Sequence, residues 1–308
     1  MDRTEIIYNL AEIAGWEAYR NEPMSRHTSF KIGGEADTYI KVKDISQLKT
    51  LIKECREADV DYFLIGNGSN ILVSDEGIKG VVIKLGGEFK NISLLDDETI
   101  YCGSGASLAS LCKFALNSGL SGLEFAWGIP GSVGGALFMN AGAYGGEMKQ
   151  VVHSVSHITP KGEVGRIDRD DLEFGYRTSV YRKNGNIITG AVLKLKKDSP
   201  DEIRARMEDF MGRRSDKQPL EYPSAGSTFK RPEGYFAAKL IEESGLKGYT
   251  VGGAQVSEKH CGFVINKGGA TADDVKSLIE QVQKIVLEKT GQHLECEVRI
   301  VPFEDKES

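Results

Sequence analysis

Two segments in the second half of the chain carry side chains that could transfer a proton or stabilise negative charge. GYRTSVYR, residues 175–182, places arginines among aromatic and hydroxyl side chains, and an arginine can hold a carboxylate or stabilise a developing enolate. SAGSTFKRP, residues 224–232, surrounds Ser227 and Thr228 with small residues. A hydroxyl exposed there could deliver a proton to a strongly basic carbanion or enolate. Taken singly, each segment also fits a solvated strand end or a charged surface loop.

A third segment, LECEVRIVP at residues 294–302, offers carboxylates near the end of the chain. If it forms a strand, Glu295, Glu297 and Arg299 share one face, because alternate residues of a strand point the same way. A carboxylate on that face could act as an acid or orient a ligand. A solvated strand face would give the same pattern, so the segment needs support from the rest of the chain.

Basic residues gather between positions 213 and 231, although the chain as a whole is acidic. The net charge is −6, and the isoelectric point is about 5.6. That balance argues against a general nucleic-acid surface. A local basic cluster suits a polyanionic ligand such as a nucleotide diphosphate sugar. The cluster consists of Arg213, Arg214, Lys217, Lys230 and Arg231, opposed by Asp216 and Glu221.

Two glycine-rich stretches could bring backbone close to a phosphate ligand. The longer is GIPGSVGGALFMNAGAYGGE at residues 128–147, and the shorter is GNGSN at residues 66–70. Backbone N–H groups in such loops can point at a diphosphate. Neither stretch completes the G-x-G-x-x-G dinucleotide fingerprint, and the sequence has no G-x-x-x-x-G-K-[ST] loop. Tight turns remain the alternative for each loop alone.

Apolar spacing predicts helices and strands mixed along the chain. Residues 36–85 follow a β-α-β-β pattern with a glycine loop at the end of a strand, where open α/β sheets bind ligands. A polar stretch at 196–200 predicts the main domain boundary, and residues 215–233 read as a long loop. The expected helices cover 3–14, 44–58, 108–118, 201–214, 235–244 and 271–289. The expected strands cover 36–42, 62–65, 71–73, 81–85, 99–102, 151–159, 163–167, 187–195, 263–266 and 293–302.

Composition favours an enzyme of a reducing compartment. The 308 residues include five scattered cysteines with no CxxC pair and no Cys/His group at zinc-ligand spacing. We therefore expect free thiols and no metal site. The N-terminal segment is acidic and amphipathic, and no apolar run approaches the length of a membrane span. These features predict a cytoplasmic protein that binds neither membrane nor nucleic acid.

Taken together and in order, these motifs resemble those of the UDP-N-acetylenolpyruvoylglucosamine reductases, flavoenzymes of bacterial cell-wall precursor synthesis. The resemblance covers nearly the whole chain and is far more specific than any single motif. It begins with RHTSFKIGG at 26–34 and ends with LECEVR at 294–299. Between these lie GNGSN, the long glycine stretch, GYRTSVYR, SAGSTFKRP, LKGYTVGGAQVS at 246–257, and FVIN at 263–266.

The resemblance implies an α+β fold: a two-subdomain FAD-binding module of the vanillyl-alcohol-oxidase type, followed by a smaller C-terminal α+β substrate domain. We expect an N-terminal helix in residues 1–20, an FAD-binding domain over 21–197, and a substrate-binding domain over 198–308. The FAD-binding domain would divide into subdomains of about 21–90 and 91–197. This fold also explains why the usual dinucleotide fingerprint is missing.

The resemblance further implies a ping-pong reaction. NADPH reduces noncovalently bound FAD, and the reduced flavin then gives hydride to the methylene carbon of an enolpyruvyl sugar nucleotide. The resulting enolate is protonated at the adjacent carbon. The family's catalytic positions fall on Arg177, Ser227 and Glu297, with Ser227 as proton donor. For Glu297 to assist beside a substrate carboxylate it should be protonated or bridging, so we expect a raised pKa.

Binding positions follow from the same resemblance. Lys217 and Lys247 are candidates for the UDP phosphates, with Arg213 from the basic cluster as a further substrate-binding candidate. The chain looks like the shorter, type II variant, which lacks a tyrosine-bearing insertion, and Tyr181 is then a candidate for closing the site. The expected FAD-binding residues are Gly66, Asn67, Gly68, Ser69, Asn70, Ile129, Pro130, Gly131, Ser132, Gly134, Gly135 and Ala141.

Two other readings stay open at this point. One is another flavin oxidase or dehydrogenase of the same fold acting on a small alcohol or hydroxy acid, which would need a base instead of a proton donor. The other is a non-catalytic nucleotide-sugar binding protein, which would not need the glycine stretch at 128–147. We expect a monomer whose partners are the UDP-sugar and NADPH.

Overall fold

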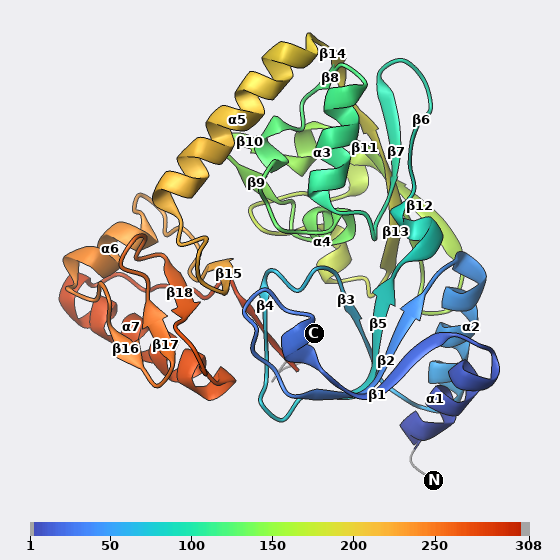
Figure 1. Ribbon diagram of the computed structural model, residues 1–308, viewed down its shortest axis with the longest axis horizontal. Coiled ribbons are helices and arrows are strands. Elements are labelled where there is room, and N and C mark those ends of the chain that lie inside the picture. The colour runs from blue at the N-terminus through green and yellow to red at the C-terminus, as the bar shows by residue number, and fades with distance from the viewer. Residues whose placement is uncertain (1–2, 303–308) are drawn as a thin grey trace.

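Three groups of strands, each with helices of its own, follow one another along the chain (Figure 1). The computed structural model describes residues 3–302. The outer ends of the predicted first and last domains, residues 1–2 and 303–308, lie outside the described residues. The predicted boundary at residue 197 falls between a short strand and a long helix. The division into domains stays a prediction.

The first sheet is mixed. The edge strand formed by Glu17–Pro23 runs antiparallel to its neighbour, and the other two pairs of strands are parallel. Helix α2 begins after Asp44, whose side chain accepts a hydrogen bond from Gln47 N–H, and it buries Leu48, Leu51 and Ile52 as its apolar spacing predicts. In spatial order the strands are β1 (Glu17–Pro23), β2 (Glu35–Val42), β5 (Ile78–Leu85) and β3 (Tyr62–Ile65). The helices are α1 (Arg3–Ile13) and α2 (Ile45–Glu57).

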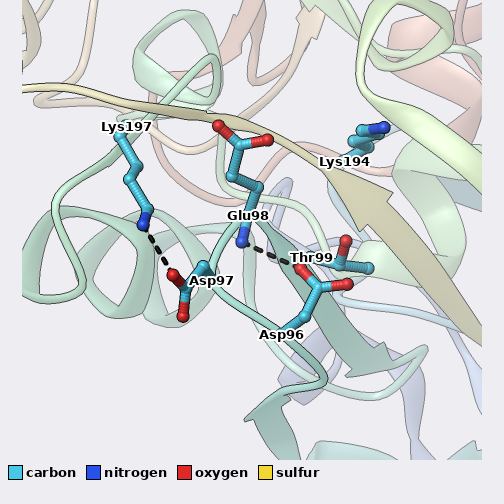
Figure 2. Close-up of a pocket in the computed structure, with 6 residues that line it drawn as sticks. All are labelled: Asp96, Asp97, Glu98, Thr99, Lys194 and Lys197. Carbon is cyan, nitrogen blue, oxygen red and sulfur yellow. Dashed lines mark hydrogen bonds and ion pairs between the residues drawn. The ribbon is translucent and has the colours of Figure 1, made fainter.

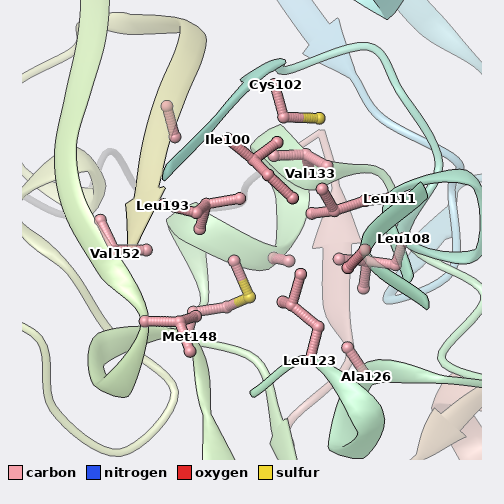
Figure 3. Close-up of a cluster of buried hydrophobic side chains, with 14 of the residues drawn as sticks. Ile100, Cys102, Leu108, Leu111, Leu123, Ala126, Val133, Met148, Val152 and Leu193 are labelled. Carbon is pink, nitrogen blue, oxygen red and sulfur yellow. The ribbon is translucent and has the colours of Figure 1, made fainter. Parts of the chain in front are cut away.

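The second sheet is antiparallel throughout and covers a large apolar core (Figure 3). Val133 within the glycine stretch and Met148 directly after it reach into this core, so the stretch is anchored near its start and at its end. In spatial order the strands are β12 (Val164–Asp168), β11 (Val152–Ile158), β13 (Ile187–Lys194), β7 (Thr99–Gly103) and β6 (Ile92–Leu94). Helices α3 (Leu108–Asn117) and α4 (Val133–Phe138) belong to this part. Two separate two-stranded sheets pair β8 (Leu120–Ser121) with β14 (Lys196–Lys197), and β9 (Gly142–Ala143) with β10 (Gly146–Glu147).

Helix α5 (Pro200–Lys217) connects the second group of elements to the third (Figure 1). Proline at its start and acidic residues in its first turn favour helix initiation there. The helix is longer than the predicted 201–214. Residues 215–233 are therefore not one long loop, because α5 continues to Lys217 and β15 (Ser224–Ser227) forms a strand. Sequence reasoning missed β15 because small residues give no apolar alternation.

The third sheet is antiparallel and packs on a long helix whose N-terminus carries a capping box. Thr271 accepts a hydrogen bond from Asp274 N–H, and the Asp274 carboxylate accepts one from Thr271 N–H. Phe30 and Leu72 from the first part of the chain also pack in this core. The strands are β15, β18 (Phe263–Asn266), β17 (Ala254–Val256) and β16 (Thr250–Val251), in that order. The helices are α6 (Ala237–Glu243) and α7 (Ala272–Thr290).

The end of the chain returns to the first part of the molecule. Strand β19 (Arg299–Val301) pairs in parallel with β4 (Ile71–Val73). The predicted strand over 293–302 is therefore wrong in its first half. Residues 295–297 run instead beside residues 228–230 through an isolated bridge, and the chain then turns to reach β4.

Single-turn helices complete the described structure, and none of the described helices is both long and apolar enough to cross a membrane. The single-turn helices are η1 (Met24–Arg26), η2 (Gly87–Lys90), η3 (Glu124–Ala126), η4 (Met148–Gln150), η5 (Arg169–Asp171) and η6 (Val180–Arg182).

The loop after β4 caps helix α7, which predicts a measurable stabilising contact. The Asp75 carboxylate accepts hydrogen bonds of 2.9 and 3.1 Å from the N–H groups of Ala272 and Asp273. The first N–H groups of a helix have no partner within the helix, and they lie at the positive end of its dipole, so a carboxylate is favourable there. We expect Asp75→Ala to lower the free energy of unfolding by about 1–2 kcal/mol. Urea unfolding would measure this, with Glu76→Ala as the matched control; equal midpoints for both variants would contradict the assignment.

Candidate active site

Arg177 and Glu297 form an ion pair although 120 residues separate them. The Arg177 Nε donates to Glu297 Oε1 over 2.6 Å, and the Glu297 side chain is only 9% exposed. Burial raises the pKa of Glu297, and the neighbouring Arg177 charge opposes this shift without cancelling it. The direction is the one expected from sequence. Arg177 also adopts a positive φ of 56°, a backbone conformation that non-glycine residues adopt at a cost.

Ser227 and Glu297 lie on adjoining backbone segments. Ser227 ends β15, and the carbonyl of the next residue, Thr228, accepts a 2.8 Å hydrogen bond from Glu297 N–H. A second hydrogen bond joins the same two segments, because Lys230 N–H donates to Glu295 O over 2.8 Å. Glu297 thus turns toward Arg177, whereas Glu295 is exposed and pairs with Lys230. The shared face of the two glutamates stays a prediction, and both lie near Lys230, whose charge lowers the pKa of Glu295 and opposes the rise in the pKa of Glu297.

The loop that carries Arg177 is fastened to the glycine stretch. Asn140 Nδ2 donates to Gly175 O over 3.0 Å, and the Ser179 hydroxyl donates to Phe138 O over 2.9 Å. Asn140 is almost fully buried and has a positive φ of 43°. Sequence reasoning assigned it no role. Its signal was an amide side chain within an otherwise apolar and glycine-rich stretch.

The GNGSN loop contacts the backbone on either side of Val298. Asn70 Nδ2 donates to Glu297 O over 3.3 Å, and Asn70 O accepts from Arg299 N–H over 3.0 Å. The Ser29 hydroxyl, within the RHTSFKIGG motif, donates to Ser224 O over 2.6 Å and lies 3.3 Å from Gly68 O. Direct hydrogen bonds therefore hold together the GNGSN loop, the Ser29 segment, strand β15 and the segment that carries Glu297.

The two predicted phosphate loops lie against each other. A Cβ added at Gly66 would come within 2.6 Å of Ser132 Oγ, so a side chain there would displace the Ser132 hydroxyl. A Cβ at Gly131 would lie 3.9 Å from Ser69 Oγ, on the opposite side of the same junction. The glycines at these positions permit a close approach of two backbones, as expected for a cofactor cradle.

Several backbone N–H groups at this junction are available to a ligand. Within residues 3–302, the N–H groups of residues 67–70 donate no hydrogen bond, and neither do those of Gly131 and Ser132. The nearby Ser104 hydroxyl is buried and has no hydrogen-bond partner among residues 3–302. Consecutive free amides are an anion-binding arrangement. The residues present therefore fit the diphosphate of a noncovalently bound FAD.

The rest of the glycine stretch has a different role. The N–H of Ile129 donates to Ala126 O, that of Gly134 to Ser104 O, and that of Gly135 to Ser132 Oγ. These amides are already satisfied, so they shape the loop instead of offering donors. The predicted cofactor residues thus separate into those with free N–H groups and those that position them.

The predicted substrate-binding side chains are dispersed. Arg213 and Lys217 are exposed on the last turns of α5, where Arg213 pairs with Asp209. Lys247 is exposed between α6 and β16 and lies 3.7 Å from Glu242. Tyr181 is 2% exposed in the core of the second sheet, and its hydroxyl lies 3.1 Å from His157 Nδ1. Burial contradicts the suggestion that Tyr181 closes the site.

Arg214 is a buried cation that sequence reasoning placed only in the basic cluster. Its Nη1 donates to Gln218 Oε1, and its Nε has no partner among the described residues. Burial lowers the pKa of Arg214. A Cβ at Gly128 would lie 3.1 Å from the Arg214 side chain, so this arginine lies against the start of the glycine stretch.

A surface hollow elsewhere contains none of these groups. Figure 2 shows it between the β6–β7 turn and the end of β13, where Lys197 pairs with Asp97 over 2.7 Å. Its lining is exposed and charged, and it includes no residue of the candidate site. Among the described residues no group of three or more His, Cys, Asp or Glu side chains could hold a metal ion.

Comparisons with known proteins agree over most of the chain. A family model described as the UDP-N-acetylenolpyruvoylglucosamine reductase C-terminal domain matches residues 218–301, and an FAD binding domain model matches residues 36–168. The reductase of Syntrophomonas wolfei is 51% identical over 91% of this chain and 94% of its own length. That of Clostridium botulinum strain Hall is 53% identical over 92% of each chain.

Solved structures confirm the expected fold. The crystal structure of the UDP-N-acetylenolpyruvylglucosamine reductase from Thermus caldophilus matches with a TM-score of 0.81 and 38% identity, covering 93% of this chain and 99% of that one. A berberine bridge enzyme variant matches at a TM-score of 0.50 and 16% identity over 63% of this chain, which indicates a shared fold alone. The α+β fold with an FAD-binding module of the vanillyl-alcohol-oxidase type is thus confirmed. The chain belongs to the UDP-N-acetylenolpyruvoylglucosamine reductase family.

Proposed function

We propose that this protein catalyses the FAD-dependent, NADPH-driven reduction of UDP-N-acetylglucosamine enolpyruvate to UDP-N-acetylmuramate, a step of peptidoglycan precursor synthesis. The observation that carries the proposal is the partly buried Arg177–Glu297 ion pair. The backbone of Glu297 is hydrogen-bonded both to the segment after Ser227 and to the GNGSN loop. The names of the homologous reductases agree with this activity. When bound, FAD would supply the hydride-transfer chemistry between NADPH and the enolpyruvyl group.

The cofactor would be held chiefly by backbone. The free N–H groups of residues 67–70, Gly131 and Ser132 are donors for its diphosphate, and the hydroxyls of Ser69 and Ser104 can add to them. The N–H groups of Gly134 and Gly135 already donate to Ser104 O and Ser132 Oγ, so these two residues shape the second loop. Because the proposed contacts to FAD are hydrogen bonds, acid should release free FAD from the protein.

Arg177 and Glu297 would bind the carboxylate of the enolpyruvyl group and stabilise the additional negative charge that develops on it. Arg177 supplies a fixed positive charge in a partly buried site, where electrostatic stabilisation is stronger than in water. Glu297 would otherwise repel the substrate carboxylate. Its raised pKa favours the protonated form, which can donate a hydrogen bond to that carboxylate.

Ser227 would donate the proton that completes the reaction, from its hydroxyl to the carbon next to the carboxylate. A serine hydroxyl is a weak acid in water, but an enolate carbon is basic enough to take its proton. Gly226 precedes Ser227 with a φ of 79°, so a left-handed turn sets the direction of the serine at the end of β15. Arg213, Lys217 and Lys247 stay candidates for the UDP diphosphate, and they would have to act from the protein surface.

The alternative is a flavin oxidase or dehydrogenase acting on a small alcohol or hydroxy acid. Such an enzyme needs a base that is free to accept a proton from the substrate, whereas the Glu297 carboxyl group is held in an ion pair with Arg177. The two readings separate in an anaerobic assay. We expect continuous NADPH oxidation only when the enolpyruvyl sugar nucleotide is present; reduction of the flavin by alcohols or hydroxy acids would favour the alternative.

We also propose that the enzyme is a cytoplasmic monomer. The five cysteines are unpaired, which suits a reducing compartment. The groups proposed for catalysis all come from one chain, so the site does not require a second copy.

A further inference from the structure

Lys84 extends from the first sheet to the GNGSN loop. It lies at the end of β5, beside Ile65 of β3, which is the last strand residue before that loop. Its ammonium donates a short hydrogen bond to Gly66 O and lies 3.3 Å from Asn67 Oδ1. Lys84 therefore contacts the first two residues of the loop whose N–H groups are free.

The charge of Lys84 is unusual for its position. The side chain is half-buried, yet no carboxylate among residues 3–302 pairs with it. The charged groups facing it are cations, namely Lys41 on the neighbouring strand β2 and Lys90 in η2, and Lys41 is itself paired with Glu17. A half-buried, unpaired cation lowers stability unless it serves another purpose.

The geometry of the peptide group gives Lys84 a defined effect on the loop. In a trans peptide the C=O of one residue and the N–H of the next point in opposite directions. Because Lys84 holds the Gly66 C=O, the Asn67 N–H must point away from Lys84. Asn67 carries the first of the free N–H groups of residues 67–70, so the contact between Lys84 and Gly66 O fixes the direction of that N–H bond.

We propose that Lys84 is a positioning residue for the FAD diphosphate, which fixes the Gly66–Asn67 peptide so that the free N–H groups face the ligand. The inference rests on the proposed function only in taking FAD as that ligand. Lys84 also leaves a net positive charge beside the loop, which favours an anion there. No contact between Lys84 and the reacting atoms is required.

A pH dependence follows from the same arrangement. Burial, with smaller contributions from Lys90 and Lys41, lowers the pKa of Lys84 to about 8. A bound diphosphate favours the charged form, so above that pH the binding of FAD must take up a proton. FAD affinity should therefore decrease as pH rises from 7 to 9.5. Burial raises the pKa of the Cys55, Cys102 and Cys112 thiols to about 12, so they do not titrate in this range.

Titration of the full-length apoprotein with FAD, followed by flavin fluorescence, tests the proposal. We expect Lys84→Met to raise the Kd for FAD by roughly 10- to 100-fold at pH 7, because a charge-assisted hydrogen bond is lost. Lys84→Arg keeps a permanent charge, so its affinity should stay near that of the wild type and no longer vary with pH. The matched control is Lys79→Met on the same strand, where the lysine is 88% exposed and pairs with Asp37.

The outcomes distinguish this inference from the proposed function. A wild-type protein that binds no FAD would contradict the proposed function itself. If the wild type binds FAD and Lys84→Met binds as tightly as Lys79→Met, the positioning role is wrong. Thermal melting of each apoprotein shows whether a variant is folded. If Lys84→Met does not fold, the test is the pH dependence of the Kd for FAD in the wild type and in Lys84→Arg. Identical pH dependence in these two proteins would overturn the proposal.

Discussion

Replacing Ser227 by alanine should leave reduction of the flavin by NADPH intact and slow turnover of the enolpyruvyl sugar nucleotide by roughly 10²- to 10⁴-fold. The serine hydroxyl is proposed to act only after hydride has left the flavin, so the first half-reaction does not need it. Rapid-mixing absorbance measurements of each half-reaction would separate the two effects.

The control for this variant is Ser224→Ala on the same strand. Ser224 contributes its backbone carbonyl to the Ser29 hydroxyl, and the substitution leaves that contact in place. We expect Ser224→Ala to resemble the wild type in both half-reactions. Equal losses in both half-reactions of Ser227→Ala would show that Ser227 supports the structure of the site instead of donating a proton.

Replacing Gly131 by leucine should remove FAD binding while the protein stays folded. A Cβ at this position would make ordinary contact with Leu108, at 3.5 Å, and the backbone φ is not positive, so the residue itself is tolerated. The remainder of a leucine side chain would extend into the junction between the two loops. We expect the Kd for FAD to rise by roughly 100-fold or more, because the side chain occupies the space of the ligand.

Gly212→Leu is the matched control for Gly131→Leu. Gly212 lies in α5, and a Cβ there would meet no atom within 4 Å. We expect this variant to bind FAD normally and both apoproteins to melt within about 3 °C of the wild type. Retention of FAD by Gly131→Leu would mean that the diphosphate lies elsewhere.

Much of the fold was predictable because its signals are local. Apolar spacing predicted helices α2, α3 and α7, and alternating or apolar runs predicted β3, β4 and β18. The Thr271 capping box was readable from residues three positions apart. The glycine loops were recognisable as unusual, but sequence reasoning found no packing reason for the glycines left out of the expected FAD-binding residues. Gly146 has such a reason, because a Cβ there would meet the Phe125 ring at 2.5 Å.

The assembly of the site was less predictable because it depends on contacts between distant segments. The Arg177–Glu297 pair joins residues from different parts of the fold, and only the family resemblance suggested that they meet. Asn140 and Lys84 act through backbone carbonyls, which leave no trace in a residue pattern. The final segment was misread as one strand because its alternation does not reveal which segments it pairs with. Tyr181 was misplaced because an aromatic residue near a catalytic motif can equally belong to the core.

The central claim is that a flavin held by the two glycine loops would reduce an enolpyruvyl sugar nucleotide, with Ser227 donating the proton and Arg177 and Glu297 binding the substrate carboxylate. The most direct measurement is anaerobic stopped-flow absorbance. NADPH first reduces the enzyme-bound flavin, and UDP-N-acetylglucosamine enolpyruvate is then added. We predict prompt recovery of the oxidised flavin spectrum with formation of UDP-N-acetylmuramate. A flavin that stays reduced until oxygen is admitted would contradict the account.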